Sequence, residues 1–190
     1  MIYGSWRQRL ARSLHTSRSK PHARFVQLAS VDVNGKVQNR TLVYRGFIDD
    51  SDALIMVTDR RSDKYEAIKN NQQVELCWYF DKSREQYRIN GLINIIDVQN
   101  AQLSQTNQVT REQVWKTLSA SAQAQFYWYL NEGKDNNLPE QITEPELIPD
   151  TFCVMLLLPT EIDYLLLADP QQRFINKKTN GKWQELPIKP

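Results

Sequence analysis

Runs of apolar residues separated by short polar turns predict that the first hundred residues form β-strands. In "RFVQLASVDVNGKVQNRTLVYRGFI" (24–48), two β-rich runs are joined around Asn34-Gly35, a pair that strongly indicates a short hairpin. Three more strands are predicted by "ALIMVT" (53–58), "QQVELCWYFD" (72–81) and "QYRINGLINIID" (86–97). Because the connections between these runs are short, we expect an antiparallel meander.

The second half begins with a helical pattern and then returns to strands. Thr110 and Gln113 match a capping box, which opens an expected long helix over 110–130. Residues 131–150 are polar and contain proline, which predicts a loop. Strands are predicted again in "TFCVMLLLP", "EIDYLLLAD" and "RFINKKTNGKW", the last of which holds a second Asn-Gly pair. This pattern predicts a mainly β protein with flanking helices, built as a closed or half-closed barrel.

The first 20 residues predict a basic helix. Trp6, Leu10 and Leu14 recur every four residues and form one apolar face, while the segment 5–25 carries cations and no acid. Three interpretations fit this pattern: a transit peptide rich in Arg and Ser, a basic helix for an anionic surface, and a packed N-terminal helix with solvated cations. We favour the packed helix, because only one short apolar stripe is present.

Composition and charge narrow the class of protein. A chain of 190 residues suffices for one ordinary domain, so we expect a single domain over 1–190. Its 24 Lys and Arg residues against 22 Asp and Glu residues give a net charge of +2. This small charge provides no global drive towards nucleic acid or a membrane, and we expect neither as a partner.

Cysteine usage and hydropathy exclude further classes. Cys77 and Cys153 lie in apolar runs where a thiol acts as a small hydrophobe, and no Cys or His cluster indicates a metal site. No apolar stretch reaches the roughly 20 residues of a membrane span, and no signal-peptide core is present. We therefore expect a cytoplasmic protein without a bound metal.

The segment "VTDRRSDKYEAIKNN" (57–71) joins the end of an apolar strand to the start of a short helix. Ser62 or Asp63 can cap that helix. Hydroxyls, free backbone N–H groups and cations are thereby collected in one place, and a phosphate monoester needs this combination. The same residues also fit a solvent-exposed turn that binds nothing. Taken alone, this segment is more often such a turn than a phosphate site.

The common catalytic motifs are absent, so the remaining candidates are polar residues on strands. No Gly-rich nucleotide loop, serine-hydrolase elbow or HExxH motif occurs, and His15 and His22 have no second ligand nearby in the sequence. Arg40 and Arg45 lie five apart in "RTLVYR", so on an ideal strand they point to opposite faces. Both can serve one site only if the strand bends or another subunit takes part.

Taken together and in order, these segments resemble the pyridoxamine 5'-phosphate oxidase-like, FMN-binding split-barrel family, and especially its small flavin-binding members of unassigned substrate. The resemblance covers almost the whole chain. It rests on "NRTLVYRGF", "TDRRSDK", "FYWYL", "PTEIDYLLL", "QRF" and "NGKWQELPIKP". It implies an antiparallel, Greek-key-like split β-barrel, FMN as the cofactor, and a homodimer with FMN at the subunit interface.

The resemblance also implies roles for individual residues. The FMN phosphate would be held by Arg40, Arg61, Ser62 and Lys64. The ribityl chain and the flavin edge would lie along Thr41, Leu42, Val43, Val57 and Thr58. Arg45 matches a cation that faces the flavin and the substrate, and Gln86 and Arg173 would reach the flavin from the partner subunit. A cation or amide near the pyrimidine end of a flavin stabilises the charge that appears on reduction.

Other positions depart from the family's oxidases of pyridoxine phosphate, in which Tyr, Arg and Ser of the long helix and Arg and His of the last hairpin hold the substrate phosphate. Here "LSASAQAQFYW" contains no Arg, and Asp169 and Gln171 stand where Arg and His would. Leu165 replaces a Trp, and Asp63 replaces a basic residue for which Arg61 can substitute. We therefore expect FMN binding with a substrate that lacks a phosphate.

The expected function is that of an FMN-dependent oxidoreductase whose small-molecule substrate is unassigned. The catalytic residue is also unassigned, with Arg45 as the candidate. Two alternatives stay open at this point. One is a flavin-binding carrier or redox sensor without turnover, and the other is a protein without flavin that uses its basic helix on nucleic acid or a membrane.

Overall fold

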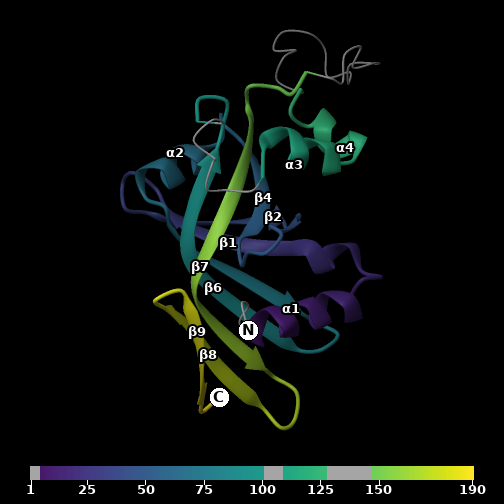
Figure 1. The fold of residues 1–190 in the computed structure, drawn as a ribbon, viewed down its shortest axis with the longest axis vertical. Coiled ribbons are helices and arrows are strands. Elements are labelled where there is room, and N and C mark those ends of the chain that lie inside the picture. Colours follow the sequence, from purple (N-terminus) through teal and green to yellow (C-terminus); the bar gives the residue numbers. More distant parts are fainter. Residues whose placement is uncertain (1–4, 101–108, 128–146) are drawn as a thin grey trace.

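The computed structural model describes residues 5–100, 109–127 and 147–190. Its strands are β1 (Phe25–Val31), β2 (Val37–Val43), β3 (Gly46–Phe47), β4 (Leu54–Asp59), β5 (Gln73–Phe80), β6 (Glu85–Ile96), β7 (Phe152–Leu166), β8 (Gln172–Thr179) and β9 (Lys182–Ile188). Its helices are α1 (Ser5–Thr16), the 3₁₀ turn η1 (Pro21–Arg24), α2 (Asp63–Asn70), α3 (Arg111–Thr117) and α4 (Ala120–Ala124). Figure 1 shows β6 and β7 running along the molecule, with α3 and α4 at one end and the β8–β9 hairpin at the other.

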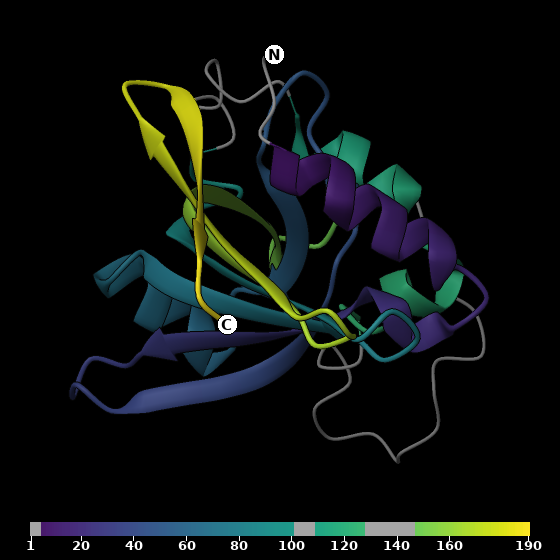
Figure 2. The ribbon, with the colours of Figure 1, turned by 90° about the horizontal axis from the view of Figure 1, so that it is seen from below.

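The strands form one antiparallel sheet in the order β2-β1-β5-β6-β7-β4-β3, and β8 and β9 extend it from β7. Figure 2 shows the strands curving into an incomplete ring with α1 along one side. The ring stays open because β2 and β3, which are adjacent in the chain, lie at opposite ends of the strand order. Tyr44 donates its backbone N–H to Arg24 on one side of the opening, and Arg45 donates to Ile55 on the other, at 2.8 and 2.9 Å. The expected split β-barrel is confirmed.

The β6–β7 pair can form its long ladder only because residue 91 has no side chain. A Cβ atom at Gly91 would overlap the backbone carbonyl of Leu158. The register shifts between Asn90 and Gly91, which marks a bulge at this close approach.

Two apolar clusters fill the molecule on either side of β4 and β7. The cluster inside the barrel contains Leu28, Met56 and Trp78, and α1 adds the fully buried Trp6 and Leu10. The second cluster lies beneath α3 and α4. Of the three interpretations of the N-terminal helix, the structure favours the packed one.

Three expectations about the secondary structure need correction or restriction. The capping box at Thr110 is confirmed, but the single helix expected over 110–130 is wrong within the described residues. The chain turns extended at Leu118, and Ser119 caps a new helix, α4. The two strands expected over 151–169 are one continuous strand, β7. The polar loop expected over 131–150 lies mostly outside the described residues. No helix in the described part of the chain is long and apolar enough to cross a membrane.

Candidate functional site

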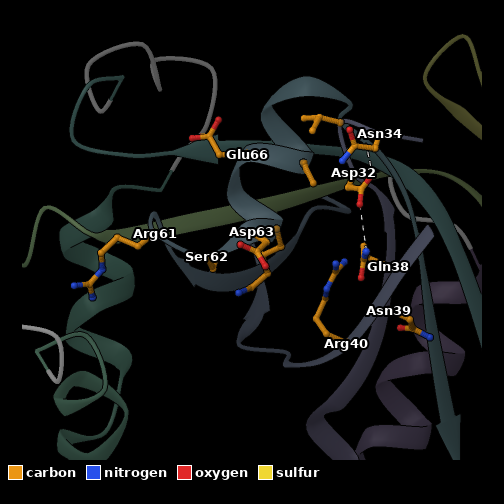
Figure 3. Close-up of a pocket in the computed structure, with 12 residues that line it drawn as sticks. Asp32, Asn34, Gln38, Asn39, Arg40, Arg61, Ser62, Asp63 and Glu66 are labelled. Carbon is orange, nitrogen blue, oxygen red and sulfur yellow. Dashed lines mark hydrogen bonds between the residues drawn. The ribbon is translucent and has the colours of Figure 1, made fainter. Parts of the chain in front are cut away.

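A cleft of about 730 Å³ lies between the start of α2 and the β1–β2 hairpin (Figure 3). Two local features of the chain create it. β4 ends at Asp59 and the chain turns into α2, while the hairpin carries β2 past the same point. Arg40, Arg61, Ser62 and Lys64, which sequence reasoning placed together, all line this cleft.

The Arg40 guanidinium is held in place by the hairpin. Arg40 pairs with Leu28 across the ladder, and its Nη1 donates to Ser30 Oγ at 2.6 Å and to the Leu28 carbonyl at 3.3 Å. Burial lowers the pKa of Arg40, but a guanidinium stays charged at neutral pH. Neither of these two partners is an anion, so the positive charge remains available to a ligand.

Lys64 places a second cation in the same cleft. It is half-buried, and burial together with the nearby charge of Arg40 lowers the pKa of Lys64, although Asp59 and Asp63 act in the opposite direction. Two partly desolvated cations that face one cleft repel each other. An anion bound between them would remove that repulsion.

The start of α2 strengthens the same anion site. Ser62 stands at the N-cap position, as expected, but its side chain makes no cap hydrogen bond. Its Oγ instead donates to the Asp59 carbonyl at 2.6 Å and lies 3.1 Å from Thr58 Oγ1. The side chain therefore leaves the first N–H groups of the helix to other acceptors, and these groups carry the positive end of the helix dipole.

Arg61 lies differently from the other predicted phosphate ligands. Its Nε and Nη2 donate to the two carboxylate oxygens of Asp59 at 3.0 and 2.7 Å. Figure 3 shows the guanidinium pointing away from Arg40. Arg61 therefore lines the cleft, but its guanidinium is paired with Asp59.

Sequence reasoning missed the far wall of the cleft. Asp32, Asn34 and Gln38 line it from the hairpin, and the Asp32 carboxylate accepts from the backbone N–H groups of Asn34 and Lys36 at 2.9 and 3.0 Å. The sequence did contain a feature that could have predicted this wall. The Asn34-Gly35 turn forms the hairpin that places Asp32, Asn34 and Gln38 beside the cleft. Asp63 and Glu66 from α2 also line the cleft, so carboxylates stand close to the two cations.

The residues expected along the flavin lie on the two strands that border the split. On β2, Leu42 faces the same side as Arg40, and Thr41 and Val43 face the other, as their ladder partners on β1 show. On β4, Thr58 is buried beside Ser62, and Val57 faces the cluster beneath α3. The residues expected along the flavin therefore do not all point to one side of the sheet.

Arg45 lines a second, smaller cleft of about 460 Å³ between β3, β4 and α3. Arg40 and Arg45 thus serve different clefts, as their five-residue spacing indicated. The Nε atom of Arg45 is buried and has no hydrogen-bond partner among the described residues. Burial, with the nearby charge of Arg24, lowers the pKa of Arg45.

Gln86 and Arg173 lie on the outer face of the sheet, in one row across three strands. Both are paired with Leu165, Gln86 from β6 and Arg173 from β8. Arg173 Nε and Nη2 donate to the carboxylate of Asp163 at 3.0 and 2.7 Å. Neither Gln86 nor Arg173 lines the two clefts, so within one chain the structure does not bring them to Arg40.

Comparison with known proteins decides the family. Residues 3–97 match the model of the pyridoxamine 5'-phosphate oxidase FMN-binding domain. The chain belongs to this family. The pyridoxine/pyridoxamine 5'-phosphate oxidase 2 of Arabidopsis thaliana is 35% identical over 181 residues, which cover 93% of this chain and 90% of that protein.

Two solved structures are similar to this chain. A pyridoxamine 5'-phosphate oxidase-related, FMN-binding protein from Nostoc punctiforme is 35% identical and superposes with a TM-score of 0.89, over 99% of this chain and 98% of its own. PhzG from Burkholderia lata, solved with tetrahydrophenazine-1-carboxylic acid, is 17% identical with a TM-score of 0.71, over 96% and 91%. The second likeness shows the fold alone.

FMN is the cofactor of the family, and the large cleft suits its phosphate. The donors present are a guanidinium, an ammonium and the N-terminus of α2, and these groups recognise a phosphate dianion. The observation that tests this fit is that Arg40 and Lys64 line the cleft and form no ion pair within the described part of the chain. Within the described residues, no group of three His, Cys, Asp or Glu side chains could hold a metal ion.

Proposed function

We propose that this protein is an FMN-dependent oxidoreductase that works as a homodimer on a small substrate without a phosphate group. The observation that carries the proposal is the convergence of Arg40 and Lys64 at the start of α2, with Arg45 at the other end of the "RTLVYR" segment. Bound FMN would supply the acceptance and release of two electrons.

The roles of the chain's own groups follow from their places. Arg40, Lys64 and the first N–H groups of α2 hold the phosphate, and the hydroxyls of Thr58 and Ser62 lie beside it. Arg61 can add its charge only by leaving Asp59. The segment Thr41–Val43 and the side chain of Val57 line the ribityl chain and the flavin edge. Arg45 stabilises negative charge on the flavin or the substrate.

A homodimer is supported by the outer face of the sheet. Phe25 at the start of β1 and Tyr79 near the end of β5 are 43% and 47% exposed there, which is high for large aromatic side chains. Tyr79 pairs with Gln86 across the ladder. A second chain covering this face would bury both aromatic residues and would bring its own Gln86 and Arg173 to the flavin.

The absence of a substrate phosphate is supported by the residues found in α3, in α4 and in the turn before β8. Arg111 is the one Arg of α3 and α4, and its guanidinium donates to the backbone carbonyls of Phe152 and Pro149 at 3.0 and 2.7 Å. Asp169 and Gln171 are exposed in the turn before β8. A dianionic substrate would find no further cation at these positions.

The test begins with the absorbance spectrum and the mass of the small molecule in the purified protein. Anaerobic photoreduction followed by oxygen then shows whether the flavin turns over, and a substrate panel separates an oxidoreductase from a carrier. Stopped-flow mixing with pyridoxamine phosphate under anaerobic conditions tests the substrate class. We expect little bleaching at millimolar pyridoxamine phosphate. Rapid, saturable bleaching at micromolar concentration would overturn that part of the proposal.

A further inference from the structure

The Arg45 cleft has the features of a binding site in its own right. It is lined by one cation, by the carboxylate of Asp49, by apolar side chains that include residues of β3, β4 and α3, and by two neutral polar residues of α3. The residues that carry the argument are Arg45, Phe47, Ile55, Gln113, Val114 and Thr117. Its volume of about 460 Å³ falls in the range of small-molecule sites.

Arg45 is a half-buried cation that lacks a counter-charge. Its Nε is buried without a hydrogen-bond partner, and no carboxylate among the described residues forms an ion pair with it. Asp49 lines the same cleft but is not within ion-pair distance of it. A partly desolvated guanidinium with an unsatisfied N–H is costly unless an acceptor completes it. A carboxylate would supply both the missing acceptor and a counter-charge.

The polar groups of α3 are already oriented by the protein. Gln113 Oε1 accepts from the backbone N–H of Thr110 at 2.8 Å, so its amide N–H₂ group remains for a ligand. Thr117 Oγ1 donates to the Val114 carbonyl at 2.6 Å, so it can only accept a further hydrogen bond. The cleft thus offers a guanidinium fork, one amide donor and one hydroxyl acceptor.

The apolar wall is also held in place. The guanidinium of Arg7 lies 4.3 Å from the centroid of the Phe47 ring and donates to the carbonyl of Ser51. Trp6 packs against the same ring at 6.0 Å between centroids. Phe47, Ile55 and Val114 therefore present a stable apolar surface beside the Arg45 cation.

We propose that this cleft binds a small monocarboxylate with an apolar body, with the carboxylate on Arg45. A guanidinium fork matches a carboxylate in two parallel hydrogen bonds. Asp49 at the same cleft opposes a second negative charge, and no Lys or other Arg lines the cleft among the described residues. A phosphate dianion is therefore the poorer ligand. The inference rests on the proposed function in one respect: it names the substrate class of the flavin site.

The test compares three ligands of similar shape by calorimetry on the FMN-loaded protein, with the flavin spectrum recorded in parallel. Benzoate carries one negative charge, benzamide none and phenyl phosphate nearly two. We expect saturable binding of benzoate with a change in the flavin spectrum, and at least about tenfold weaker binding of the other two. Equal binding of benzamide, or tighter binding of phenyl phosphate, would overturn the proposal.

Variants locate the binding. Arg45→Gln should weaken benzoate at least about tenfold, whereas Arg12→Gln, which removes an exposed cation from α1, should leave it unchanged. Thr117→Trp keeps Arg45 and fills the cleft from an exposed position of α3, so it should also abolish binding even if Arg45→Gln folds poorly. Benzoate binding that survives in Thr117→Trp would refute the site.

The same experiment separates the two proposals. If the protein retains FMN and is photoreduced but fails to bind benzoate, only the proposed carboxylate site is refuted. If the protein holds no FMN but binds benzoate in an Arg45-dependent manner, the proposed oxidoreductase function is refuted and the proposed carboxylate site stands.

Discussion

Replacing Lys64 by methionine should weaken FMN binding sharply without weakening the fold. Methionine keeps most of the stem that lies along the cleft and removes only the charge. Because burial and Arg40 already disfavour the Lys64 cation in the FMN-free protein, its loss should leave the free energy of unfolding of that form unchanged or slightly higher. The cost should appear only when the phosphate is bound.

The magnitude follows from the kind of contact that is lost. A charge-assisted hydrogen bond contributes about 1.5–3 kcal/mol, and each 1.4 kcal/mol is a factor of about ten in the dissociation constant. Lys64→Met should therefore raise the Kd for FMN by about 10- to 150-fold. Since one charge contact with the phosphate is removed, the dependence of binding on salt should also become weaker.

The assay is titration of the FMN-free protein with FMN, followed by flavin fluorescence at two salt concentrations. Lys69→Met is the matched control, because Lys69 lies on the same helix, is exposed and does not line the cleft. Thermal unfolding of the FMN-free variants checks the fold. Equal Kd values for Lys64→Met and the unmodified protein, or an equal loss in the control, would refute the phosphate site at α2.

Four further outcomes are expected. Asp63→Asn should tighten FMN several-fold at low salt, because it removes a carboxylate from the phosphate cleft; unchanged titrations would place that carboxylate outside the phosphate's field. Tyr79→Arg should give a monomer by light scattering with reduced FMN retention, since it puts a charge on the face proposed for the dimer; a dimer with full FMN would argue for another interface. Gly91→Ala should lower the free energy of unfolding by about 2–3 kcal/mol in urea titrations, because its methyl group would overlap the Leu158 carbonyl. Burial raises the pKa of Cys153 to about 12 against an ordinary value of 9.0, so its thiol should resist a thiol reagent at pH 8 until the protein is unfolded, and this group's contribution to stability should fall as pH rises from 9.0 towards 12.

Much of the chain's local structure could be read from the sequence because it depends on neighbouring residues. The Asn34-Gly35 turn, the apolar runs of β4 to β6 and the capping box at Thr110 are set by local preferences, and all three predictions are confirmed. The strand-to-helix segment that lines the large cleft was recognisable for the same reason. Its hydroxyls and cations are close in sequence, so a short turn suffices to place them together.

Other features depend on which of several possible partners a group contacts in the folded chain, and these were not predicted. The break at Leu118 divides an expected helix in two, since Ser119 caps a new helix over the cluster around Phe152. The pairing of Arg61 with Asp59 turns a predicted phosphate ligand away from the cleft. In both cases several arrangements fit the sequence pattern, and the pattern does not show which of them has the lowest free energy.

The sequence by itself determined which chemistry is present, and the tertiary structure decided where it acts. The five-residue spacing of Arg40 and Arg45 predicts opposite faces on an ideal strand. In the structure β2 ends at Val43, and only the opening of the sheet between β2 and β3 gives the two residues separate clefts. The same sheet leaves Gln86 and Arg173 on its outer face. The physical reason is that side-chain direction follows the local backbone, whereas a cleft exists only where strands distant in sequence approach without pairing.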